Sequence, residues 1–207
     1  MTGAGTQLTM TPSAHAQTAL GPEAALQEMM EGNRRFVEGR MTSFNDDLKM
    51  LKAKTAEKQE PFAALLSCAD SRVPVELIFD QTIGHLFVTR VAGNVASSEM
   101  IASLEYGVAV LGTKAIMVLG HANCGAVKAS IEAKAVPGQI SALYRYIRPA
   151  VDQAGKDLDA ATKANAKIQA ALLRESSPVI ADAIKKKQLT VVAAFYDLAS
   201  GKVSRVD

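Results

Sequence analysis

Residues 85–120 read HLFVTRVAGNVASSEMIASLEYGVAVLGTKAIMVLG, and this stretch is the clearest indicator of the fold class. It opens with a short apolar run over 85–90 and closes with another over 115–120, each with the length and composition of a buried strand. Between them, apolar residues from Ile101 to Leu111 recur at helical spacing, after a serine, Ser98, that can cap a helix. Strand, helix and strand in this order predict parallel strands joined by a right-handed crossover.

The same pattern continues on both sides of this stretch. Two further strands are expected over 61–67 and 189–196, the latter being the last, with helices over Pro22–Val37 and, more weakly, Asp46–Ala56, and a mostly helical region from Cys124 to about Lys187. The sequence therefore predicts an α/β fold. Its core is a doubly wound, mainly parallel sheet of four to five strands, flanked by helices and preceded by an N-terminal helical arm.

The chain has 207 residues and is 48% hydrophobic, which is enough for one domain with a sizeable core. We expect residues 1–21 to form a disordered arm or the remnant of a leader, and residues 22–207 to form a single domain. Ser13-Ala-His-Ala16 has the small-x-small pattern of a signal-peptidase site, but the arm lacks a charged start and an apolar stretch. The expected location is the cytoplasm, or the periplasm if the arm is a leader remnant.

Charge and hydropathy exclude two classes of partner. The 23 basic and 21 acidic residues are mixed along the chain, for a net charge of +2, so there is no basic stripe for a nucleic-acid backbone. No apolar run approaches the roughly 20 residues of a membrane span. We therefore expect neither nucleic acid nor membrane as a partner.

Two of the predicted strands end in turns that carry reactive side chains. Cys68 follows the first strand, and His121 and Cys124 follow the third. Ligands of open parallel sheets bind beyond the carboxyl ends of the strands, so these turns are expected to face one another. Two thiolates and an imidazole favour zinc, and this polar setting argues against a disulfide between the two cysteines.

Asp70 and Arg72 lie in the first of these turns. With three protein ligands a zinc site keeps its fourth position open, whereas Asp70 as a fourth ligand would close it. Arg72 can pair with Asp70 and hold the carboxylate off the metal, so that it accepts a hydrogen bond from zinc-bound water or hydroxide. Because zinc lowers the pKa of bound water, we expect activity to rise above neutral pH.

These residues resemble the signature of the β-class carbonic anhydrases, which combines Cys-x-Asp-x-Arg with His-x-x-Cys. The first motif is Cys68-Ala-Asp70-Ser-Arg72 and the second is His121-Ala-Asn-Cys124. The likeness extends over roughly residues 22–203. It implies zinc on Cys68, His121 and Cys124, and reversible hydration of carbon dioxide to bicarbonate and a proton, with zinc hydroxide as the nucleophile.

The resemblance also implies a substrate pocket and a partner. In plant-type members a glutamine, a phenylalanine and a tyrosine line the carbon dioxide pocket, and Gln59, Phe87 and Tyr106 stand at the matching positions. A homodimer or a dimer of dimers is expected. Its N-terminal helices would embrace the partner subunit, with Leu26, Met29, Met30 and Phe36 packing across the interface.

Some alternatives and departures stay open at this point. The same fold and ligands would serve a carbonyl sulfide or carbon disulfide hydrolase, and the two cysteines would serve a non-catalytic zinc redox sensor. Val91 stands where many relatives have asparagine. The chain has no tryptophan, the residue that a bicarbonate-regulated subgroup uses, so we expect no regulation of that form.

Overall fold

The computed structural model describes residues 18–42 and 55–207. Its centre is a sheet of five strands in the order β2-β1-β3-β4-β5. The strands are β1 (Ala63–Ser67), β2 (Leu86–Arg90), β3 (Ala115–His121), β4 (Thr190–Tyr196) and β5 (Val203–Arg205). The first four are parallel, and β5 runs antiparallel to β4. The α/β class and the mainly parallel sheet are confirmed, but β4 is not the last strand, because the chain turns back and pairs once more.

Helices surround this sheet. They are α1 (Pro22–Val37), α3 (Val75–Ile78), α4 (Ser98–Ala109), α5 (Gly125–Glu132), the short 3-10 helix η3 (Ile140–Leu143), α6 (Tyr144–Ala154), α7 (Leu158–Ser176) and α8 (Pro178–Lys185). The predicted capping serine of α4 is off by one residue: Ser98 is the first helical residue, and Ser97 occupies the N-cap position. The helix predicted over Asp46–Ala56 lies almost wholly outside the described residues. None of the described helices is long and apolar enough to cross a membrane.

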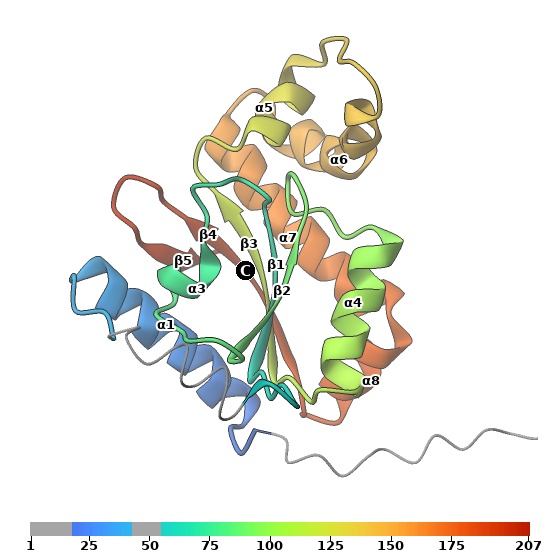
Figure 1. Ribbon diagram of the computed structural model, residues 1–207. Helices are drawn as coiled ribbons and strands as arrows, with labels where there is room; N and C mark the ends of the chain where they lie inside the picture. Colours follow the sequence, from blue (N-terminus) through green and yellow to red (C-terminus); the bar gives the residue numbers. More distant parts are fainter. Residues whose placement is uncertain (1–17, 43–54) are drawn as a thin grey trace, which may run out of the picture.

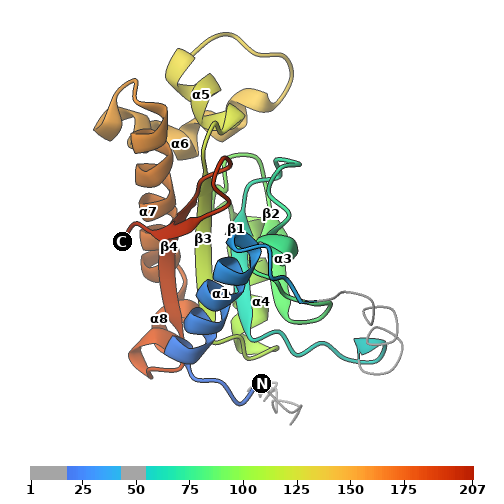
Figure 2. The ribbon, with the colours of Figure 1, turned by 90° about the vertical axis from the view of Figure 1, so that its left-hand side faces the viewer.

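Helices cover both faces of the sheet (Figures 1 and 2), and each face carries its own core. Alternate strand residues such as Leu65 and Met117 pack under α1 and α3, whereas Leu66 and Ile116 pack under α4, α7 and α8. Successive side chains of a strand point to opposite faces, so strands buried on both faces have to be apolar throughout. Helices on both faces make the fold doubly wound, as predicted.

Helix α1 is fastened to this chain's own core. Leu26 is 4% exposed and Met29 is fully buried within the single chain, while Met30 and Phe36 are partly buried against the same core. The expectation that Leu26 and Met29 pack across a dimer interface is therefore wrong, because both side chains are already covered within one chain. Helical spacing shows that a face is apolar but does not show which surface covers it.

The carboxyl ends of the parallel strands point to the top of Figure 1, the side of the sheet on which α5 and α6 lie. In the register of the sheet, Ser67 at the end of β1 lies beside Leu119 of β3 and Arg90 of β2. The turns that follow β1 and β3 therefore leave the sheet next to each other, as predicted from the sequence.

Candidate metal centre and active site

Three donors meet at this end of the sheet. Cys68 directly follows β1, His121 is the last residue of β3, and Cys124 is the N-cap residue of α5. Their sulfur and nitrogen donor atoms all lie within 4.8 Å of one another, and none of the three residues is more than 4% exposed. The structure thus brings together residues more than 50 positions apart in the chain, as the motifs predicted.

The imidazole of His121 is oriented for a metal. Its Nδ1 lies 2.9 Å from the carbonyl oxygen of Ala122, so this nitrogen carries the proton and donates it. Its Nε2 is buried and has no hydrogen-bond partner among the described residues. An unpartnered buried nitrogen is costly unless something else binds it.

The spacing of the donors suits zinc. Zinc bonds of about 2.3 Å to sulfur and about 2.0 Å to nitrogen, in a tetrahedron, separate the ligand atoms by roughly 3.5–3.8 Å. The observed limit of 4.8 Å is compatible with that geometry. Two cysteines and one histidine are also the donor set of zinc sites that keep a fourth position open. The residues present therefore fit a zinc ion.

The two thiols act as a pair. The thiol of Cys124 donates a hydrogen bond to Cys68 and so lowers the pKa of Cys68, and the backbone N–H of Gly93, 3.3 Å from the Cys68 sulfur, lowers it further. The same partnership, together with burial, raises the pKa of Cys124. A metal ion bound here would displace the protons that the two thiols retain.

Asp70 and Arg72 form a close pair beside these donors. Arg72 donates to the Asp70 carboxylate from Nε (2.9 Å), from Nη2 (2.7 Å) and from its backbone N–H (2.9 Å). Arg72 Nη2 also donates to the carbonyl oxygen of Asn123, which lies between His121 and Cys124 in the chain. The guanidinium of Arg72 holds the pKa of Asp70 far below its usual range.

The Asp70 carboxylate also approaches the imidazole of His121. Its Oδ2 lies 3.8 Å from His121 Nε2 while it remains bonded to Arg72. The Asp70 carboxylate therefore lies next to the three donors, and both of its oxygens bond to Arg72. The structure confirms the contact between the two residues, and their catalytic roles stay predictions.

Arg90 and Gly93 belong to the site, although neither was predicted from the sequence. Arg90 donates from Nε to the carbonyl oxygen of Cys68 (3.0 Å) and from Nη2 to that of Asp70 (2.6 Å). It can do so because it ends β2 in register with Ser67. The available signal was its place at the end of a strand predicted to run parallel to the first.

The predicted pocket residues lie elsewhere. Phe87 pairs in register with Ala64, so it is about 13 Å along the sheet from Cys68, at roughly 3.3 Å per residue. Its ring lies 6.1 Å from that of Tyr106 on α4, and Gln59 is exposed in the segment that enters β1. The structure joins Phe87 to Tyr106 but places neither of them, nor Gln59, at the metal position of the same chain.

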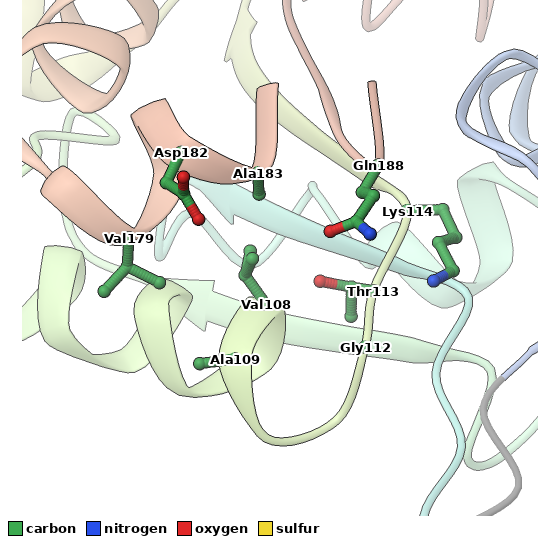
Figure 3. A pocket seen from close by; sticks show the side chains of 9 residues that line it. All are labelled: Val108, Ala109, Gly112, Thr113, Lys114, Val179, Asp182, Ala183 and Gln188. Atoms are coloured by element: carbon green, nitrogen blue, oxygen red, sulfur yellow. The ribbon is translucent and has the colours of Figure 1, made fainter. Parts of the chain in front are cut away.

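A cavity of about 250 Å³ lies between α4 and α8 (Figure 3). None of the three donors lines it. It is lined by the segment Gly112–Lys114, which precedes β3, and by residues of the two helices such as Val108 and Asp182. It therefore opens at the amino ends of the strands. The cysteines lie at the opposite end.

Comparisons with known proteins agree with this site. The family model of carbonic anhydrases matches residues 63–203. "Carbonic anhydrase 2" of Mycobacterium tuberculosis is 36% identical over 189 residues, covering 87% of this chain and 91% of that protein. The β-carbonic anhydrase of Coccomyxa, solved with acetazolamide, is 29% identical with a TM-score of 0.68, covering 91% and 86% of the two chains.

A tetrameric β-carbonic anhydrase from Sordaria macrospora shares the fold, with a TM-score of 0.71 at 23% identity, over 87% of this chain and 95% of that one. The matched family model spans the region that contains all three donors, Asp70 and Arg72. The chain belongs to the β-carbonic anhydrase family.

Proposed function

We propose that this protein catalyses the zinc-dependent, reversible hydration of carbon dioxide to bicarbonate and a proton. The observation that carries the proposal is the meeting of Cys68, His121 and Cys124, with the carboxylate of Asp70 held beside them by Arg72. A purely structural zinc site needs no such carboxylate and arginine. Zinc bound to the three donors would act as a Lewis acid that lowers the pKa of a water molecule toward neutrality.

Asp70 has the task of orienting the nucleophile. With three hydrogen bonds from Arg72 it stays an anion, and an anion accepts hydrogen bonds but donates none. Its Oδ2 lies 3.8 Å from His121 Nε2, where it can accept a hydrogen bond from the attacking oxygen. That hydrogen bond would orient the oxygen so that the oxygen's own lone pair faces carbon dioxide. Arg72 prevents the carboxylate from becoming a fourth ligand.

The surroundings suit a small apolar substrate. Val95, Val127 and Ile147 are buried in one cluster with the two cysteines. Such walls exclude bulk water and strengthen the electrostatic interactions inside. Carbon dioxide has no hydrogen-bond donor, so its transfer from water into such a site costs little free energy. Bicarbonate is charged, and its hydration favours its return to water.

We also propose that the protein is a homodimer or a dimer of dimers, with residues 22–207 as the folded domain and 1–21 as an arm. Tyr106 is 47% and Val110 is 50% exposed on α4, next to the half-buried Phe87 of the edge strand β2. This apolar surface supports a subunit contact. If Gln59, Phe87 and Tyr106 line a substrate pocket, they therefore serve the metal centre of a partner subunit.

Mixed dimers test that arrangement. A Tyr106→Ala chain and an Asp70→Asn chain, each of low activity alone, are unfolded together and refolded as a mixture. With random pairing, half the dimers are mixed and carry one intact site in two, so about a quarter of wild-type activity should return. No recovery in mixtures that do form mixed dimers would place the pocket within one chain.

The activity itself is tested by stopped-flow hydration of carbon dioxide at about pH 8.5, using reduced protein with one zinc per chain. Fast hydration that is lost in Asp70→Asn, with zinc retained, supports the proposal. Turnover of carbonyl sulfide or carbon disulfide without hydration would favour the hydrolase. Zinc release by peroxide without either activity would favour the redox sensor.

A further inference from the structure

Helix α7 carries two buried carboxamides on one face. Asn165 is fully buried and Gln169, one turn later, is 1% exposed. We call these two residues the amide pair. Buried carboxamides are costly unless their donors and acceptors are used. In this pair Gln169 Nε2 donates to Asn165 Oδ1 (3.1 Å) and to the carbonyl oxygen of Tyr146 (3.0 Å).

The remaining groups of the amide pair hold the loop between β2 and α4, residues 91–97, which we call the site loop. Asn165 Nδ2 donates to the carbonyl oxygen of Gly93 (2.8 Å), and Gln169 Oε1 accepts from the backbone N–H of Ala96 (2.9 Å). Both contacts span more than 70 residues of sequence. The amide pair thus bonds to the site loop at two residues, Gly93 and Ala96.

The site loop in turn contacts a metal ligand. A turn closed by the N–H of Asn94 and the carbonyl oxygen of Val91 (2.9 Å) places Gly93 in the left-handed region, with φ of 76°. In that turn the N–H of Gly93 points at the sulfur of Cys68 and lies 3.3 Å from it. A continuous set of hydrogen bonds therefore runs from α7 through the loop to the sulfur.

We propose that the amide pair positions the Gly93 N–H on the Cys68 sulfur and thereby sets how strongly that sulfur donates electrons to the metal. An N–H that donates to a thiolate withdraws electron density from it, which leaves the metal a stronger Lewis acid. Asn165 and Gln169 are positioning residues, since they act through the loop. The inference rests on the proposed function only in that Cys68 binds zinc.

Cobalt substitution tests the inference without relying on activity. The Co²⁺-loaded wild-type protein should show a sulfur-to-cobalt charge-transfer band in the near ultraviolet. Loss of the N–H contact makes the sulfur a stronger donor, so the band should move to longer wavelength in Asn165→Leu and in Gln169→Leu. Thr162→Val is the matched control, because Thr162 is equally buried on α7 but, among the described residues, its hydroxyl bonds only to Leu158 of its own helix.

The rate of the zinc protein gives a second readout. A weaker Lewis acid shifts the pH profile of kcat/KM to higher pH. In the two leucine variants kcat/KM should therefore be about tenfold or more below the wild-type value near neutrality, and this difference should shrink as the pH rises. Unchanged bands and profiles in folded Asn165→Leu would show that the pair is merely structural. If the leucine variants do not fold, the nearly isosteric Asn165→Asp carries the same test, because it removes the Nδ2 donor to the carbonyl oxygen of Gly93.

The outcomes separate this inference from the proposed function. A shifted band in a protein that never hydrates carbon dioxide would support the amide pair and refute the activity. An active wild type with an unshifted band in the variants would do the reverse. If the wild-type cobalt protein lacks the charge-transfer band altogether, the cysteines do not bind the metal, and both proposals fail.

Discussion

The substitution Gly93→Ala tests whether the site loop needs a residue without a side chain at position 93. Gly93 has φ of 76°, where a side chain is strained. A Cβ built there would lie 2.8 Å from Ile147 Cδ1 and 3.2 Å from Ala126 Cβ. The first distance is far inside van der Waals contact. The added methyl group should therefore push the loop away from α6 and the Gly93 N–H away from Cys68.

Two costs add up in this variant. An alanine in the left-handed region costs about 1–2 kcal/mol, and overpacking a tight core costs about 1–3 kcal/mol. The expected loss of unfolding free energy is therefore about 2–5 kcal/mol. Ile147→Val removes the very atom that clashes, at its own cost of about 0.5–1.5 kcal/mol.

A double-mutant cycle separates the two costs. Urea denaturation of the wild type, both single variants and the double variant gives the coupling between positions 93 and 147. Relief of the clash should make the double variant more stable than additivity predicts, by about 1–3 kcal/mol. A coupling near zero would show that there is no clash with Ile147, because the alanine would then be destabilising for unrelated reasons.

Three further predictions concern the rest of the molecule. Asn33 is 3% exposed, and its side chain bonds to backbone groups of Ile78, Gly201 and Val203. Asn33→Leu leaves these three groups unpaired, at about 1 kcal/mol or more each, so urea denaturation should show a loss of at least about 3 kcal/mol in unfolding free energy. A loss below about 1 kcal/mol would contradict this. Burial raises the pKa of Asp80, but hydrogen bonds from Arg35 and Thr42 outweigh it and leave the pKa lowered. The stability that Asp80 contributes should therefore be present above about pH 4 and be lost as the pH falls through the lowered folded pKa. The free energy of unfolding of wild type and Asp80→Asn, measured against pH, checks this. A difference between the two proteins that stays constant down to acid pH would contradict it. Removal of zinc by a chelator should abolish hydration and lower the melting temperature, and one zinc ion per chain should restore both; activity that survives in protein shown to be metal-free would exclude the zinc mechanism.

Much of the centre could be predicted from local sequence. Cys68, Asp70 and Arg72 follow one apolar run, and His121 and Cys124 follow another, so their convergence needed only the rule that parallel strands end at one edge. The strand ends differed from expectation by one or two residues. The missed strand β5 is three residues long, Val203–Arg205, and only one of them is buried. Such a short edge strand has no periodicity to detect.

Other features depended on the tertiary structure. The burial of Leu26 and Met29 within one chain could not be read from helical spacing, because an apolar face packs equally well on its own sheet or on a partner. The separation of Phe87 from the metal centre follows from the register of β1 and β2, and register depends on how whole strands align. Spacing along the chain does not contain that information.

Local sequence is enough to predict the fold class, the family and the chemical nature of the centre, because strand and helix periodicity and the zinc-binding side chains are local properties of the chain. Three sets of contacts appear only in the folded chain: Arg90 bonds to the turn holding Cys68 and Asp70, Gly93 directs its N–H to the Cys68 sulfur, and Asn165 and Gln169 hold the loop in place. These contacts join groups 20 to 73 residues apart. Hydrogen bonds over such separations depend on the packing of the complete fold.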